Sequence, residues 1–151
     1  MRKNLKIWQP QTCVISDKAR IGDNVVIHPG TIVYNETEIG DDTKIQAQCF
    51  IPNRIKIGKK CFIGPGTKFS NDCLPPSKKK YWKKTIVKDG AVIAIGCVVL
   101  PGVVIGKGSM LGAGSLLTKN IPDRECWIGS PAKYYCKVKD LKNKCKKRFN
   151  Y

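Results

Sequence analysis

Residues 19–45 read ARIGDNVVIHPGTIVYNETEIGDDTKI, and a branched aliphatic residue stands at every sixth position from Ile21 to Ile45. The same aliphatic column begins at Ile15, continues to Phe69, and resumes from Val87 to Leu117. A second column, two residues earlier in each unit, is mostly small, and glycine often follows the aliphatic residue. An α-helix has about 3.6 residues per turn and cannot keep such a register over many units. Short strands joined by tight turns can, so the pattern predicts a β-helix with the large residue in the core and the small one near a corner.

The repeats divide the chain of 151 residues into the parts of one predicted domain. Residues 1–12 are expected to cover the first coil with Ile7 and Trp8, because an open coil end exposes backbone and core. Residues 13–69 and 85–117 are expected to form the coils.

One long segment interrupts the repeats, reading SNDCLPPSKKKYWKK over residues 70–84. Two prolines and five lysines predict an extended, exposed loop. The aliphatic column returns in phase at Val87, as if the loop replaced most of one coil. Loops that project from repeat scaffolds commonly carry the binding face, so the loop is the predicted active-site segment.

A helix is predicted over residues 130–149. Ser130-Pro131 resembles an N-cap followed by a proline in the first turn. Apolar residues then recur at helical spacing. They are Tyr134, Val138, Leu141, Cys145 and Phe149.

The formal net charge of +17 comes from lysine-rich clusters in the loop and in residues 133–148. Such clusters bind nucleic acid, acidic membrane surfaces or phosphorylated small molecules, or they form a solvated face. Residues 1–10 contain no apolar run of signal-peptide length, and no stretch approaches the roughly 18 apolar residues that span a membrane. A cytoplasmic protein is therefore expected.

Eight cysteines raise the question of disulfides or zinc. Cys13, Cys49, Cys61 and Cys97 fall in the small column, where a thiol acts as a compact apolar group. The other four form no C-x2-C pair that would indicate a zinc site. The cysteines are therefore expected to be structural, with no metal bound.

Several segments resemble the hexapeptide-repeat acyltransferases, whose coils are left-handed, and within them the N-acetyltransferases of nucleotide-linked amino sugars. The resemblance covers roughly residues 13 to 133 and implies acetylation of the amino group of a UDP- or dTDP-linked sugar, often at C3. Ser70 stands where that subgroup usually has Thr, and Pro76 where it commonly has Arg, so a nearby lysine would have to meet the phosphates. The motifs are Lys44-Ile45-Gln46, Gly64-Pro65, Phe69-Ser70-Asn71-Asp72, Pro75, Trp82, Val87-Lys88-Asp89-Gly90-Ala91, Gly112-Ala113-Gly114-Ser115 and Gly129-Ser130-Pro131-Ala132-Lys133.

The resemblance also implies roles for single residues. Asn71 would orient the sugar amine through its side-chain carbonyl, and Asp72 would accept a hydrogen bond from the ammonium or assist proton removal. An Asn-Asp pair that merely initiates a turn is the alternative. The other implied substrate contacts are Gln46, Gln48, Lys78, Lys80 and Trp82. The implied acetyl-CoA contacts are Ala94, Gly112, Ala113, Gly114, Lys119 and Lys133.

An amine nucleophile suits a chain with a single histidine, His28. A neutral sugar amine attacks a thioester without a strong base, so positioning and backbone N–H groups for the oxyanion suffice. The alternatives are a sugar O-acetyltransferase with His28 as general base, or a non-catalytic basic scaffold. The family is trimeric, which implies a homotrimer with three equivalent sites between subunits and no nucleic-acid or membrane partner.

Overall fold

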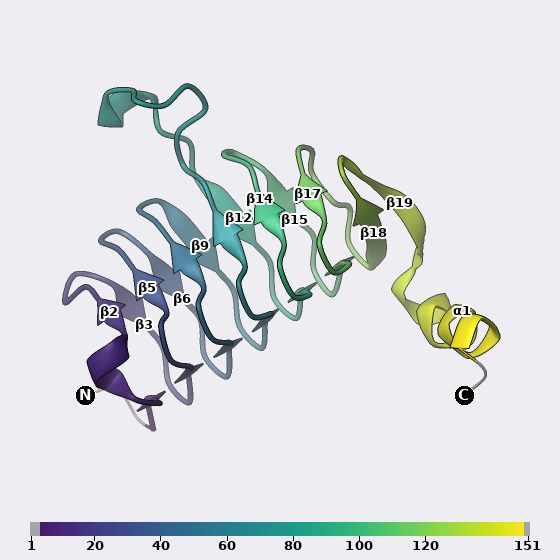
Figure 1. The fold of residues 1–151 in the computed structure, drawn as a ribbon, viewed down its shortest axis with the longest axis horizontal. Helices are drawn as coiled ribbons and strands as arrows, with labels where there is room; N and C mark the ends of the chain where they lie inside the picture. Colours follow the sequence, from purple (N-terminus) through teal and green to yellow (C-terminus); the bar gives the residue numbers. More distant parts are fainter. Residues whose placement is uncertain (1–3, 150–151) are drawn as a thin grey trace.

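Each six-residue unit of the computed structural model forms a short strand and a turn, and three units complete one coil of a parallel β-helix (Figure 1). The structure describes residues 4–149. Neighbouring coils pair in register, as Val26 does with Lys44 and Ile27 with Ile45. The predicted fold class, a β-helix of hexapeptide repeats with one extended loop and a C-terminal helix, is confirmed.

The strands form three sheets, named A, B and C. Sheet A contains β1 (Lys6–Ile7), β4 (Val26–Ile27), β7 (Lys44–Ile45), β10 (Phe62–Ile63), β13 (Val92–Ile93), β16 (Met110–Leu111), β18 (Glu125–Gly129) and β19 (Ala132–Lys137). Sheet B contains β2 (Val14–Ile15), β5 (Ile32–Val33), β8 (Phe50–Ile51), β11 (Lys68–Phe69), β14 (Val98–Val99) and β17 (Leu116–Leu117). Sheet C contains β3 (Arg20–Ile21), β6 (Glu38–Ile39), β9 (Ile55–Ile57), β12 (Thr85–Val87) and β15 (Val104–Ile105).

The aliphatic column forms the core. Every member from Ile21 to Leu117 is buried, and the small column from Ala19 to Ser115 is buried beside it. The small residues do more than save space. The hydroxyl groups of Thr31, Thr37 and Thr43 each donate a hydrogen bond of 2.8–3.0 Å to a turn carbonyl fifteen residues later. These bonds matter because a buried carbonyl without a partner is costly.

The thiols follow the same arrangement, and all eight cysteines are free. The Cys49 thiol donates to the carbonyl of Gly64 at 3.3 Å, and the Cys97 thiol donates to that of Gly112 at 3.1 Å. Burial raises the pKa of Cys49 to about 11. The structural reading of the cysteines in the small column is therefore confirmed.

Alkylation of the native protein at pH 8 should separate the cysteines. Exposed Cys73 should react first, whereas Cys49 and Cys126 should resist, since burial raises the pKa of both thiols to about 11 and the thiolate is the reactive form. Peptide mass spectrometry after iodoacetamide treatment measures the order. Labelling of Cys49 as fast as Cys73 in the folded protein would contradict the buried position.

The turns align into three edges that run along the β-helix. The glycine edge lies between sheets A and B and contains residues 28–30, 46–48, 64–66, 94–96 and 112–114. The loop edge lies between sheets B and C and contains residues 16–18, 34–36, 52–54, 70–84, 100–102 and 118–120. The aspartate edge lies between sheets C and A and contains residues 22–24, 40–42, 58–60, 88–90, 106–108 and 122–124.

The loop of residues 70–84 projects from its edge, and a short 3-10 helix, η2 (Lys79–Tyr81), lies within it (Figure 1). Thr85 pairs with Ile55, 30 residues earlier, whereas the other coils pair at 18, as Val26 does with Lys44. The difference, 30 minus 18, is an insertion of 12 residues. The prediction that the loop replaces most of a coil is therefore wrong: it is added at a corner, and its length of two repeats keeps the register.

The C-terminal helix, α1 (Val138–Phe149), begins eight residues later than predicted. Residues 125–137 instead form an antiparallel hairpin of β18 and β19, and β18 continues sheet A next to β16. The exposed edge of β16 offers backbone hydrogen-bonding groups to the chain, and this tertiary pairing overrides the local N-cap signal of Ser130-Pro131. No helix within residues 4–149 is long and apolar enough to cross a bilayer.

The predicted N-terminal cap is part of the β-helix. β1 pairs with β4 in sheet A, and Ile7 packs against the core. A 3-10 turn, η1 (Pro10–Thr12), then leads to β2. Residues 1–3 of the predicted cap lie outside the described residues. Half of Trp8 remains exposed, at 46%, so it covers the coil end only partly.

Candidate active site

Asn71 belongs to a column of asparagines on the loop edge. Asn35, Asn53 and Asn71 follow one another at intervals of 18 residues, which places them in successive coils. The Nδ2 group of Asn71 donates a hydrogen bond of 3.1 Å to the Asn53 carbonyl, and the Asn71 carbonyl accepts one of 2.8 Å from the Lys83 amide. Asn71 therefore joins both ends of the loop to the coil beneath. Within residues 4–149 its side-chain Oδ1 has no donor, so this atom can accept a hydrogen bond from a ligand.

The carboxylate of Asp72 organises the loop. It accepts hydrogen bonds from the hydroxyl of Ser77 at 2.7 Å, the amide of Ser77 at 2.8 Å and the amide of Leu74 at 3.0 Å. The hydrogen bond from the Ser77 side chain is the main cause that lowers the pKa of Asp72. The residue is thus an ionised turn former, as the alternative reading of the Asn-Asp pair expected.

The remaining loop residues differ in exposure. Lys78 and Lys80 are exposed, and the ammonium of Lys80 lies 4.9 Å from the centre of the Tyr81 ring. Trp82 is half-buried, and its indole N–H is covered without a hydrogen-bond partner among the described residues. The predicted contact between Trp82 and a substrate therefore requires the loop to shift, whereas the lysines are accessible as they stand.

The glycine edge carries most of the predicted acetyl-CoA contacts. Ala94, Gly112, Ala113 and Gly114 lie there in neighbouring coils, together with the predicted substrate contacts Gln46 and Gln48. Three glycines with a positive φ stack on this edge, and no atom lies within 4 Å of the place where their Cβ would be. They are Gly66, Gly96 and Gly114. An extended ligand can therefore approach the backbone closely.

The glycine edge also differs from the aspartate edge in its backbone amides. On the aspartate edge, side chains of the next coil accept the turn amides: Asp89 accepts that of Lys59 and Asp123 that of Lys107, both at 2.8 Å. On the glycine edge, the equivalent amides of Ile95 and Ala113 have no acceptor within residues 4–149. Two exposed N–H donors therefore point outward beside the stacked glycines.

The other predicted contacts are dispersed. Lys133 lies on β19 and pairs with Ile128, which packs over Gly112 at the C-terminal end of the glycine edge. Lys119 is exposed on the loop edge, at the other end of β17. His28 begins the glycine edge, and its ring stacks on Trp8 at 6.3 Å between ring centres.

The predicted site residues therefore form two clusters in one chain. The loop cluster and the glycine edge lie at opposite ends of the sheet B strands, about 15 Å apart from the rise of the strand residues. Gln46 and Gln48 do not lie beneath the loop, as was predicted, but on the glycine edge. Sequence reasoning missed Glu36 and Arg54, which lie at intervals of 18 residues below Asp72 and hold the loop. That interval was the available signal.

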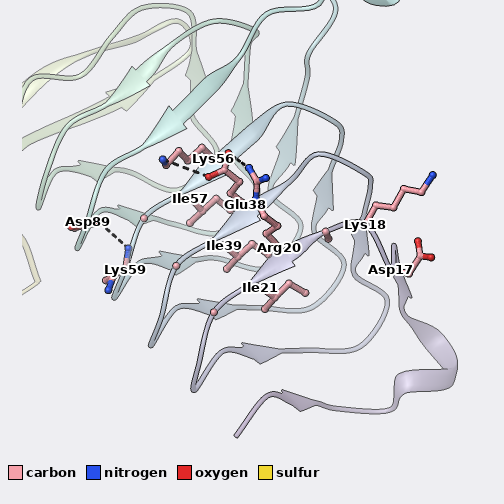
Figure 2. A pocket seen from close by; sticks show the side chains of 14 residues that line it. Asp17, Lys18, Arg20, Ile21, Glu38, Ile39, Lys56, Ile57, Lys59 and Asp89 are labelled. Atoms are coloured by element: carbon pink, nitrogen blue, oxygen red, sulfur yellow. Dashed lines mark hydrogen bonds and ion pairs between the residues drawn. The ribbon is translucent and has the colours of Figure 1, made fainter. Parts of the chain in front are cut away.

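A hollow of about 640 Å³ runs along the outer face of sheet C (Figure 2). Glu38 stands at its wall and contacts the guanidinium of Arg20 at 2.8 Å and the ammonium groups of Lys56 at 3.5 Å and Lys84 at 3.7 Å. None of the predicted site residues within the described chain lines it. We interpret this hollow as a surface of paired charges beside the loop edge.

Comparison with known proteins agrees with the fold. Residues 18–53 and 84–119 match the model of the bacterial transferase hexapeptide family (six repeats). The chain is 38% identical over 144 residues to the 2,3,4,5-tetrahydropyridine-2,6-dicarboxylate N-acetyltransferase of Bacillus subtilis, which covers 95% of this chain and 58% of that protein. The chain thus spans a little over half the length of such relatives.

Solved structures are similar as well. A variant of perosamine N-acetyltransferase from Caulobacter crescentus, in complex with CoA and GDP-perosamine, superposes with a TM-score of 0.75 at 26% identity, over 87% of this chain and 57% of that one. The acetyltransferase domain of PglB from Neisseria gonorrhoeae, in complex with acetyl coenzyme A, has a TM-score of 0.76 at 20% identity, over 89% of this chain and 59% of that one. At that identity the second likeness supports the fold alone.

Proposed function

Because this chain belongs to the hexapeptide-repeat transferase superfamily, we propose that it is a cytosolic acetyl-CoA-dependent N-acetyltransferase acting on the amino group of a nucleotide-linked amino sugar. The observation that carries the proposal is the pair of open amides, Ile95 and Ala113, on an edge without Cβ atoms. The amide carbonyls of a pantetheine arm and the oxygen of a thioester need N–H donors of this kind. The neighbouring structure with CoA and GDP-perosamine supports the same substrate pair.

The reaction needs no base of high pKa. The lone pair of the neutral amine forms a C–N bond to the thioester carbon, and an open amide of the glycine edge stabilises the oxyanion. The C–S bond then breaks, the coenzyme leaves as the thiol, and the amine proton passes to the sulfur or to water. The free Oδ1 of Asn71 accepts a hydrogen bond from the amine and orients it, while Asp72 keeps the loop folded and adds negative charge near the ammonium form.

A second copy of the chain completes the site in this proposal. Large apolar side chains are exposed on sheet B and its two edges, whereas the outward residues of sheet C around Glu38 are charged. The exposed set includes Val14 at 57%, Tyr34 at 43%, Ile95 at 57% and Val98 at 41%. A three-fold assembly that buries this face brings the loop of one protomer to the glycine edge of the next and gives three equivalent sites.

A second candidate acceptor comes from the relatives. Identity of 38% over 144 residues to a tetrahydropyridine-dicarboxylate N-acetyltransferase favours a small dicarboxylate. The accessible cations Lys78 and Lys80 suit carboxylates and phosphates alike. The two candidates share the acetyl donor and the glycine edge and differ only in what the loop binds.

An acceptor panel tests the proposal. Purified protein with acetyl-CoA should release free thiol, detected with a chromogenic disulfide, when a UDP-, dTDP- or GDP-linked amino sugar is present. Hydroxyl sugars should give no signal above hydrolysis. Turnover of the tetrahydropyridine dicarboxylate in place of the amino sugars would select the second candidate, and release only with hydroxyl acceptors would select an O-acetyltransferase that uses His28.

Asn71→Ala should lower kcat/KM for the amine acceptor at least about tenfold, because one orienting hydrogen bond to a charged or reacting group stabilises by about 1.5 kcal/mol or more. Asn35→Ala is the matched control, since Asn35 lies in the same column two coils below and contacts Ser16. Steady-state kinetics with both variants gives the comparison. An unchanged rate for Asn71→Ala would remove the loop from the site.

A further inference from the structure

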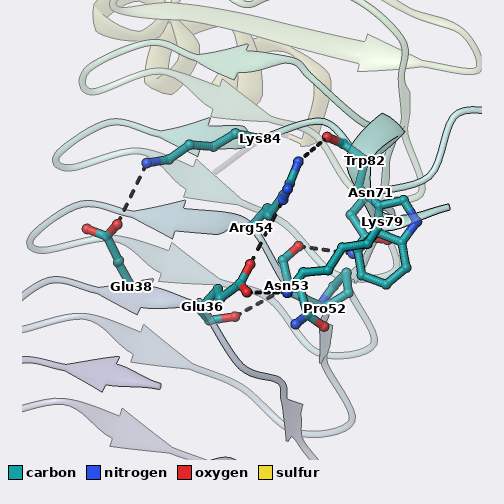
Figure 3. A network of polar contacts seen from close by, with 10 residues as sticks. Glu36, Glu38, Pro52, Asn53, Arg54, Asn71, Lys79, Trp82 and Lys84 are labelled. Carbon is teal, nitrogen blue, oxygen red and sulfur yellow. Dashed lines mark hydrogen bonds and ion pairs between the residues drawn. The ribbon is translucent and has the colours of Figure 1, made fainter. Parts of the chain in front are cut away.

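The base of the loop is held by a network of charges that starts two coils below it (Figure 3). The Arg54 Nη1 donates a hydrogen bond of 2.7 Å to the Trp82 carbonyl, close to the end of the loop. The Arg54 Nε lies 3.9 Å from the Glu36 carboxylate. The same carboxylate pairs with the ammonium of Lys79, within the loop. Glu36 and Arg54 therefore contact the loop at two separate points.

The network uses up the charges that it contains. The hydrogen bond from the Lys79 side chain is the main cause that lowers the pKa of Glu36, so the carboxylate stays ionised at neutral pH. The guanidinium of Arg54 faces a carbonyl on one side and a carboxylate on the other, and it is half-buried. Arg54 is thus poorly placed to bind a phosphate or carboxylate of a substrate in a bidentate manner.

Asn71 depends on this arrangement. It lies at the start of the loop, and its carbonyl accepts the amide of Lys83, the residue after Trp82. A loop end that is fixed through Trp82 therefore fixes Asn71 from the other side, while the amide of Asn71 is fixed to Asn53. If Trp82 is released, one of the two anchors of Asn71 becomes mobile.

We infer that Arg54 is a positioning residue, which with Glu36 clamps the loop to the β-helix and so holds Asn71 in place for the acceptor. The kinetic part of this inference rests on the proposed function, whereas the clamp itself does not. The arrangement predicts that loss of Arg54 loosens the loop, weakens use of the acceptor and leaves acetyl-CoA binding at the glycine edge unchanged.

Limited proteolysis tests the clamp without any substrate. The loop contains five lysines, so trypsin cuts it when it detaches, at a rate that follows the open fraction. Arg54→Gln should raise cleavage within residues 78–84 about tenfold, which is about 1.4 kcal/mol. Arg124→Gln is the matched control, because both arginines occupy corner positions with positive φ, 67° and 59°, and both variants lose one tryptic site. Arg54→Lys should restore part of the protection.

Glu36→Gln is the second variant, and severalfold faster cleavage is expected because both cations lose their partner. It keeps the clamp testable if Arg54→Gln folds poorly, which its melting temperature shows. Cleavage of both variants at the rate of Arg124→Gln would overturn the clamp.

The kinetic readout separates positioning from general damage. For Arg54→Gln, KM for the amine acceptor should rise about tenfold or more, while the Kd of acetyl-CoA, measured by calorimetry, stays at the wild-type value. A weaker Kd with unchanged acceptor KM would overturn the positioning role. If wild-type protein acetylates no amine, the proposed function fails, and the proteolysis result still decides whether the clamp exists.

Discussion

Replacing Gly64 with alanine is expected to lower the free energy of unfolding by about 3 kcal/mol or more. A Cβ at this position would lie 2.5 Å from the carbonyl carbon of Ala94 and 2.6 Å from the amide nitrogen of Ile95. Both are backbone atoms of the next coil, which is held by hydrogen bonds on either side and cannot move away as a flexible side chain would. Urea denaturation followed by circular dichroism gives the change.

Gly66→Ala is the control for this prediction. Gly66 lies two residues away on the same edge, with φ of +70° and no atom within 4 Å of an added Cβ. Its substitution should cost only the left-handed conformation, about 1–2 kcal/mol. Equal losses for the two variants would show that the stacking distance at Gly64 is not the constraint.

Replacing Ala113 with proline is expected to lower kcat about 10²–10³-fold while the fold remains intact. Proline removes the N–H that has no partner within residues 4–149, and loss of one oxyanion donor typically has an effect of this size. The backbone of this corner accepts proline, because Pro29 and Pro65 occupy the equivalent position in other coils. Initial rates and melting temperatures measure the two effects separately.

Two substitutions make the result specific to the N–H group. Ala113→Val adds side-chain volume but keeps the amide, and Ile95 shows that the equivalent position accepts a branched residue. Ala47→Pro removes the equivalent amide lower on the glycine edge. Both should retain most of the activity. Loss of activity in Ala113→Val as well would indicate that volume, and not the hydrogen bond, is the cause.

The sequence predicted well wherever the information is local. The aliphatic column identified the core from Ile21 to Leu117, since the spacing of buried residues follows directly from the geometry of a repeated strand and turn. The placement of Asn71 at the start of an exposed loop also follows from the interruption of the repeats. The cysteines of the small column were assigned correctly for the same reason.

Predictions that depend on distant partners were less successful. Residues 130–137 form a strand and not a helix, because the edge of β16 accepts β18 and β18 accepts β19. Gln46 and Gln48 lie on a different edge from Asn71, since a spacing in sequence does not say on which side of a coil a turn falls until the register of the three sheets is known.

The sequence by itself determined the β-helix, the position of the loop and a superfamily resemblance, because a six-residue period has one structural solution that buries its aliphatic column. Only the tertiary structure decided which amides remain open on the glycine edge and which residues hold the loop. Ile95 and Ala113 are open because no aspartate of the next coil reaches them, and Arg54 clamps Trp82 because coil stacking brings residues 28 apart into contact. Such contacts between coils depend on stacking and register, which no short stretch of sequence encodes.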